Sequence, residues 1–178
     1  WRKWLQTNHD SSPGIWFVFF KKHTGEPRVT YDESVEEALC FGWIDSLART
    51  MDEDRSRLMF TPRKPKSVWS KPNKERVAAM IASGMMTEVG LEKIDAAKKD
   101  GSWDALNSSD NLEMPNDLLK AFAKNKKALE NFNGFTESAR KMILYWLGTA
   151  KRDETRKARV EKIVSMAAAG KRANFDKE

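Results

Sequence analysis

Three short apolar segments in the first third of the chain follow the pattern of β-strands. Ile15 to Phe20 is an unbroken run of β-branched and aromatic residues between Pro13-Gly14 and a lysine pair. Such a run is typical of a strand buried on both faces, so we predict a central strand there. Trp43 to Leu47 and Leu58 to Thr61 predict two further strands, and Pro62 ends the regular pairing of the last one.

Helical spacing and capping residues account for most of the remaining chain. Thr30 and Glu33 have the spacing of a capping box, and the helix that they open ends at Gly42. Ser70 and Thr87 are the N-caps that we predict for the next two helices. After residue 107 the apolar residues recur only at helical spacing, with helix starts expected near Pro115, Thr136 and Asp153.

The fold class that follows is α+β. We predict a small antiparallel-sheet N-terminal domain with flanking helices over residues 1–106, followed by an all-helical C-terminal module over residues 107–178. The polar, turn-rich stretch 107–111 marks the boundary.

Asp45 is the acid that attracts attention in this pattern. In a strand it shares a face with Trp43 and Leu47, and a carboxylate on an apolar face is costly unless it is paired. A structural ion pair or a turn cap is one explanation, with candidate partners Arg55, Arg57, Arg63, Lys71 and Arg76. A ligand-binding or catalytic role is the other, and the sequence leaves both open.

The stretch from Trp43 to Asn73 gathers aromatic rings, cations and small hydroxyl residues more densely than any other part of the chain. Rings beside cations suit single-stranded nucleic acid or a phosphorylated small molecule. The alternative is that the rings fill the core and the cations are solvated around it. The ligand-binding residues that we predict are Trp43, Asp45, Phe60, Arg63, Ser67, Trp69, Ser70, Lys71 and Asn73.

The residue types needed for metal and nucleophilic chemistry are scarce. His9, His23 and Cys40 are the only histidines and the only cysteine, so we predict no metal site. Neither a nucleophile elbow nor a phosphate-binding loop is present, and we assign no catalytic residue and no cofactor. An enzyme is the less favoured class.

Composition limits the partners. The formal net charge of +6 permits an anionic partner, a small anionic ligand or a protein, and leaves nucleic acid as a weaker alternative. No apolar run approaches the roughly 20 residues of a membrane span, so we expect none.

We expect the protein to lie in the cytoplasm, or in the periplasm if a leader is missing from the abrupt start at Trp1. Met85-Met86 and the helical module offer a surface for a homodimer, although Met also fills gaps.

Three motifs carry a resemblance to a known family. The segments 38–45, 60–73 and 155–160 resemble the bacterial YdeI/OmpD-associated family, also described as bacteriocin-protection proteins. The N-terminal part of that family is similar to the YjbR/CyaY-like group, which implies a small α+β sheet domain. The resemblance further implies protection against bacteriocins or cationic peptides, and it brings no catalytic residues.

Three hypotheses about function follow. The first is a non-enzymatic binding or stress-protection protein whose ligand pocket lies in the stretch Trp43–Asn73. The second is a nucleic-acid or nucleotide-binding protein. The third is an enzyme that uses Asp45 together with a cationic loop.

Overall fold

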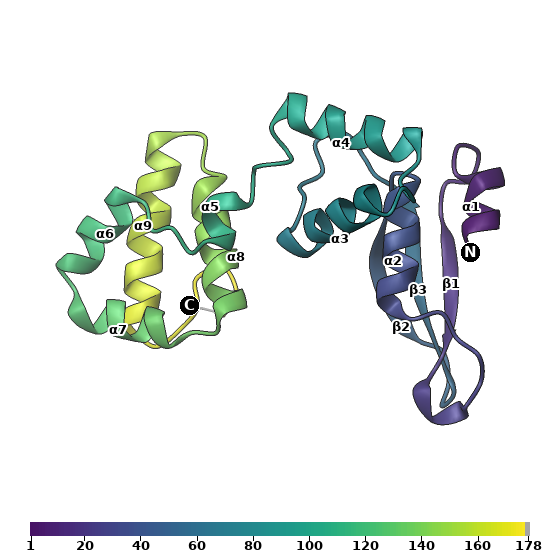
Figure 1. Ribbon diagram of the computed structural model, residues 1–178. Helices are drawn as coiled ribbons and strands as arrows, with labels where there is room; N and C mark the ends of the chain where they lie inside the picture. Colours follow the sequence, from purple (N-terminus) through teal and green to yellow (C-terminus); the bar gives the residue numbers. More distant parts are fainter. Residues whose placement is uncertain (177–178) are drawn as a thin grey trace. The chain divides into compact units, whose positions relative to one another are not determined.

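The structure is a computed structural model that describes residues 1–176 (Figure 1). The chain forms two compact units, Trp1–Ala105 and Leu106–Glu178. The first unit contains a three-stranded antiparallel sheet with helices, and the part of the second unit that the structure describes is helical. The α+β fold class is therefore confirmed.

The sheet of the first unit has the strand order β1-β3-β2, with both neighbouring pairs antiparallel. Its strands are β1 (Ile15–Phe20), β2 (Trp43–Thr50) and β3 (Arg55–Pro62). The prediction that Ile15–Phe20 is the central strand is wrong, because β3 lies in the middle and β1 at an edge. Val18 and Phe20 are 43% and 39% exposed, so the apolar run includes residues of an outer face as well as of the core.

A β-bulge interrupts the pairing of β2 with β3. Asp45 lies opposite Phe60 and Ala48 lies opposite Leu58, so two residues of β2, Ser46 and Leu47, stand opposite one residue of β3. Ala48, rather than Leu47, therefore continues the face of Asp45, and Leu47 is 46% exposed. The prediction that Leu47 shares the face of Asp45 is wrong for this reason.

Helices and one 3₁₀ turn complete the first unit. They are α1 (Arg2–Asn8), η1 (Lys22–Thr24), α2 (Tyr31–Cys40), α3 (Lys71–Ala82) and α4 (Glu88–Asp100). The capping box of Thr30 and Glu33 at the start of α2 is confirmed, and Thr87 caps α4 by accepting a hydrogen bond from Gly90 N. Gly90 also allows close packing, since a Cβ there would lie 2.3 Å from the carbonyl oxygen of Cys40 in α2.

One aromatic-rich core fills the first unit between the sheet and its helices. Rings from the N-terminal segment contact the sheet, with Trp1 5.4 Å from Phe60 and Trp4 5.7 Å from Trp43 between ring centroids. Because Trp43 and Phe60 are buried there, this face of the sheet is the core face. The residues on the other side of the strands, including Trp16 and Val18, form the outer face.

The second unit has its own core. Its helices are α5 (Asn107–Asp110), α6 (Asn116–Ala123), α7 (Lys126–Gly134), α8 (Glu137–Gly148) and α9 (Asp153–Ala168). Thr136 caps α8 through its bond from Ala139 N, as predicted. The core residues are Leu118, Phe122, Ala128, Phe132, Ile143, Leu144, Leu147, Val160, Ile163, Met166, Ala167 and Ala173.

Polar contacts add to the packing of α9. Asn131 Nδ2 donates to the carbonyl oxygen of Ala167 at 2.8 Å, which links α7 to α9. Arg156 Nε donates to Asp117 at 2.6 Å, which links α9 to α6. Across residues 1–176, the structure contains no helix with the length and apolar character that crossing a membrane requires.

Candidate functional site

The predicted ligand-binding residues separate into buried rings and accessible polar groups. Trp43, Phe60 and Trp69 are at most 1% exposed and belong to the core of the first unit. Their rings contact protein side chains, which fits the explanation that they fill the core. The polar candidates are distributed over β2, the segment after β3 and the start of α3.

Asp45 is half-buried on the core face of β2. Its carboxylate accepts a hydrogen bond from Tyr31 Oη, at 2.9 Å, which joins the first residue of α2 to the sheet. Burial and this bond raise the pKa of Tyr31. The charge of Asp45 acts to raise the pKa of Arg63, one of the predicted cationic partners, against the larger effect of burial. A catalytic role of Asp45 stays a prediction.

Ser70, Lys71 and Asn73 lie together at the beginning of α3. Ser70 is the N-cap residue, and its carbonyl accepts the amide of Lys74 although its side chain makes no capping bond. Asn73 Oδ1 accepts from Arg76 Nη1 at 3.2 Å. These contacts give Ser70 and Asn73 local structural roles, and their ligand-binding role stays a prediction.

Arg63 is the most unusual of the predicted residues. It follows β3 directly and is only 5% exposed. Its guanidinium carbon lies 3.6 Å from the ring centroid of Trp69, and Nη2 donates to the carbonyl oxygen of Val68 at 2.8 Å. Nη1 is buried and has no hydrogen-bond partner in the structure.

Burial also changes the acid–base chemistry of Arg63. It lowers the pKa of the guanidinium to about 10, against the opposing effect of the Asp45 charge. The group is still a cation at neutral pH. A buried cation with an unused donor is costly for the fold, and such groups in native structures call for a partner or an ion.

A hollow of about 720 Å³ lies beside Arg63, and we call it the Arg63 hollow. Its lining provides two cations and three hydroxyl groups and, among the described residues, no acid. The lining residues are Pro13, Ile44, Ser46, Thr61, Pro62, Arg63, Lys64, Pro65 and Ser67. Cations and hydroxyls are suited to an oxyanion, although the charge of Asp45 acts on Arg63 from outside this lining.

The Arg63 hollow brings together only part of the predicted set. Arg63 and Ser67 line it, whereas the other predicted residues do not. The prediction missed Ser46 and Lys64 as site residues. Ser46 lies in the bulge of β2, which is defined by pairing with β3 and is not visible in the local sequence. Lys64 is next to Arg63, so the sequence could have indicated it.

Within residues 1–176, no group of three or more His, Cys, Asp or Glu side chains is placed to hold a metal ion. Cys40 is buried, and burial raises the pKa of its thiol. A thiol in that state is a poor nucleophile.

Two different family models match the two parts of the chain. The chain belongs to the family described as Domain of unknown function (DUF8412), whose model matches residues 1–93, just over half of the chain. Residues 111–170 match the family described as Bacteriocin-protection, YdeI or OmpD-Associated. No curated protein and no solved structure matches the chain.

These matches narrow the resemblance drawn from the motifs. The YdeI/OmpD-associated similarity is confirmed for the helical unit, although two of the three motifs, 38–45 and 60–73, lie in the part matched by DUF8412. The similarity to the YjbR/CyaY-like group gains no support.

Proposed function

We propose that the protein is a non-enzymatic binding protein that takes a small oxyanion, such as a phosphate or a phosphorylated metabolite, in the Arg63 hollow. We further propose that it contributes to protection against bacteriocins. The second proposal rests on the family description of residues 111–170. The first rests on the site itself.

The buried, unpaired Nη1 of Arg63 is the observation that carries the binding proposal. Leaving a buried donor unsatisfied costs about 1–3 kcal/mol, and more for a charged group. An oxyanion that reached Nη1 would satisfy this donor and neutralise the charge.

The surroundings of Arg63 favour an oxyanion over other ligands. Stacking on Trp69 and the bond to Val68 fix the plane of the guanidinium, so the remaining donor has a set position. Lys64, exposed at the same hollow, supplies a second positive charge. Preorganised donors of this kind lower the ordering cost of binding.

The test is a thermal-shift titration of the whole chain with inorganic phosphate, pyrophosphate and a nucleoside monophosphate. We expect at least one of them to raise the melting temperature of the first unit, because a ligand at 100 times its Kd stabilises by about 2.7 kcal/mol. The same titration of Arg63→Met should give no rise.

Arg76→Met is the matched control. Arg76 lies in the same unit, and Nη2 pairs with Asp32 at 2.5 Å, away from the Arg63 hollow. The substitution removes the same single charge, so it separates site binding from general electrostatic attraction. An equal rise in Arg63→Met, or no rise with any anion in the wild type, would contradict the proposal.

Single-stranded nucleic acid is a second candidate, favoured by the outer face of the sheet. Arg57 lies 4.4 Å from the ring centroid of Trp16 there, and Arg49 is its pairing partner on β2. Rings and arginines on one sheet face suit stacked bases and phosphates.

Salt dependence distinguishes this second candidate. Binding of a fluorescent oligonucleotide should weaken steeply with salt, with a log–log slope near the number of phosphates contacted. Trp16→Ala should weaken it further at every salt concentration. Flat salt dependence would eliminate nucleic acid as the ligand.

A further inference from the structure

A second hollow lies on the core face of the sheet next to the start of α2, and we call it the sheet cleft. Its volume is about 520 Å³. Residues from β1 and the two lysines after it, from the segment 28–31, and from β2 and β3 line it together: Phe19, Phe20, Lys21, Lys22, Arg28, Val29, Tyr31, Ala48, Arg49, Thr50, Ser56, Arg57 and Leu58. None of the predicted site residues is among them.

The strand register identifies the floor of the sheet cleft. Phe19 lies opposite Ser56, and Leu58 lies opposite Ala48. Ser56 and Leu58 alternate along β3 with the buried Phe60, so these side chains are on the core face. Arg57 projects from the outer face of the sheet, where its guanidinium stacks on the ring of Trp16. The floor is therefore largely apolar.

The rim of the sheet cleft is cationic. Lys21, Lys22 and Arg28 line it, and none of the described lining residues is acidic. Lys21 Nζ already donates to the carbonyl oxygen of Asp52 at 2.8 Å. The side chains of Lys22 and Arg28 are exposed and have no hydrogen bond or ion pair within the described residues 1–176.

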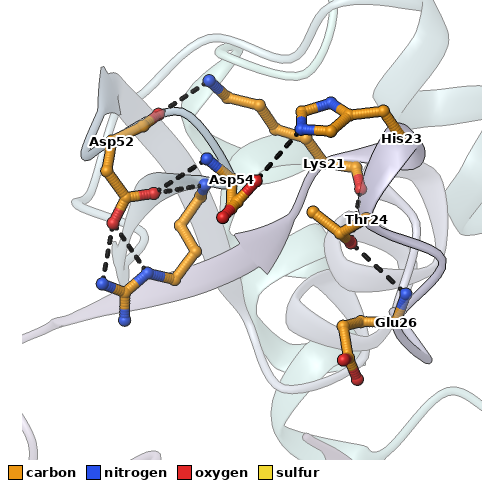
Figure 2. A network of polar contacts seen from close by, with 7 residues as sticks. Lys21, His23, Thr24, Glu26, Asp52 and Asp54 are labelled. Atoms are coloured by element: carbon orange, nitrogen blue, oxygen red, sulfur yellow. Dashed lines mark hydrogen bonds and ion pairs between the residues drawn. The ribbon is translucent and has the colours of Figure 1, made fainter.

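Polar contacts hold the walls of the sheet cleft in place. Figure 2 shows the turn between β2 and β3 joined to the segment around η1. The amide of Lys21 donates to the carbonyl oxygen of Asp54 at 2.7 Å, and His23 Nε2 lies 3.1 Å from Asp54 Oδ1. Asp52 in turn accepts from the amide and the side chain of Arg55. These contacts fix Lys21 at one wall of the cleft, which lowers the ordering cost of binding at that wall.

We propose that the sheet cleft binds a small amphipathic anion, with an apolar body on Phe19, Leu58 and Val29 and an acidic group at Lys22 and Arg28. Its volume falls in the range of about 300–1,000 Å³ usual for small-molecule sites, which are mostly apolar with a few polar groups. The positive rim without acids sets the sign of the ligand's charge. This site is separate in residues from the Arg63 hollow and does not rest on it.

The test uses two fluorescent probes with the same aromatic body. Anilinonaphthalene sulfonate carries one negative charge, and N-phenylnaphthylamine carries none. We expect saturable binding of the sulfonate to the wild-type chain. The double substitution Lys22→Gln with Arg28→Gln should raise its dissociation constant about tenfold, which corresponds to about 1.4 kcal/mol of binding free energy. Binding of the uncharged probe should be unchanged by the double substitution.

A second variant fills the cleft. Ala48 is exposed on the floor, so Ala48→Trp should fold and block both probes. Val18→Trp places the same side chain on the outer face of the sheet and is the control. Lys3→Gln with Lys99→Gln matches the charge change of the rim substitutions, at two exposed positions of the same unit that do not line the cleft.

The two outcomes are distinct. The proposal is supported if Ala48→Trp abolishes binding of both probes while Val18→Trp does not. It also requires that the rim substitutions weaken binding of the sulfonate and leave binding of the uncharged probe unchanged. Unchanged sulfonate binding in Ala48→Trp, or its loss in Val18→Trp, would overturn it. Circular dichroism and melting curves verify that each variant is folded.

Discussion

Arg63→Met should leave the first unit nearly as stable as the wild type while it abolishes anion binding. The substitution removes a charged hydrogen bond to Val68, worth about 2 kcal/mol, and the stacking on Trp69, worth about 2 kcal/mol for a desolvated pair. It also removes the cost of burying the cation. The fall of the Arg63 pKa to about 10 corresponds to a cost of about 3 kcal/mol.

The two effects nearly cancel, so we expect a loss of about 1 kcal/mol or less. Urea unfolding followed by tryptophan fluorescence measures it, because six of the seven tryptophans lie in residues 1–105. A loss above about 3 kcal/mol would refute the reasoning. Arg63 would then be a structural residue whose burial stabilises the fold, and its unused donor would not indicate a ligand.

Three further substitutions test other parts of the structure. Gly90→Ala should destabilise the first unit by about 2 kcal/mol or more in urea unfolding, because the new Cβ meets the backbone of α2; an unchanged midpoint would contradict the close helix packing. The hydrogen bond from α9 lowers the pKa of Asp117 below the ordinary 3.8, so the second unit should keep this contribution above pH 3.8 and lose it as the pH falls further. Asp117→Asn should remove only about 0.5 kcal/mol of stability at pH 7, because the ion pair is partly exposed. It should also reduce the dependence of the melting temperature on acid pH, and an unaltered pH profile would exclude the linkage. Asp45→Asn should lower the pKa of Tyr31 in an absorbance titration, with Tyr145 as the only other tyrosine; no change would disprove the bond between Tyr31 and Asp45.

Local signals in the sequence predicted the helix starts well. Thr30, Thr87 and Thr136 cap their helices because a capping bond joins residues only three positions apart. The information needed to place the cap is contained in that short segment.

Strand order and register depend on distant residues, and prediction from the sequence failed there. Ile15–Phe20 is apolar on both sides, which favours a central strand, yet the strand pairs with β3 alone. The bulge after Asp45 is fixed by pairing with β3, so nothing near Leu47 in sequence reveals it. A slip of one residue moves side chains to the other face.

In the candidate sites, too, local sequence predicted some features, while others depend on packing and strand pairing. Arg63 and Trp69 are six residues apart, so the sequence indicated their proximity, but their burial follows from packing of the whole unit. The sheet cleft combines residues from four separate segments. Its apolar floor could be recognised only after the strands were paired.

The most direct test of the anion-binding proposal is a phosphate titration observed by NMR at the guanidinium N–H signals of Arg63 and the indole N–H signal of Trp69. We predict saturable shifts of both, because the unpaired Nη1 would acquire an acceptor while the ring of Trp69 stacks on the same guanidinium. In Arg63→Met the Trp69 shift should vanish, and in Arg76→Met it should persist. Absence of a saturable shift at Arg63 and Trp69 would contradict an anion site in the Arg63 hollow.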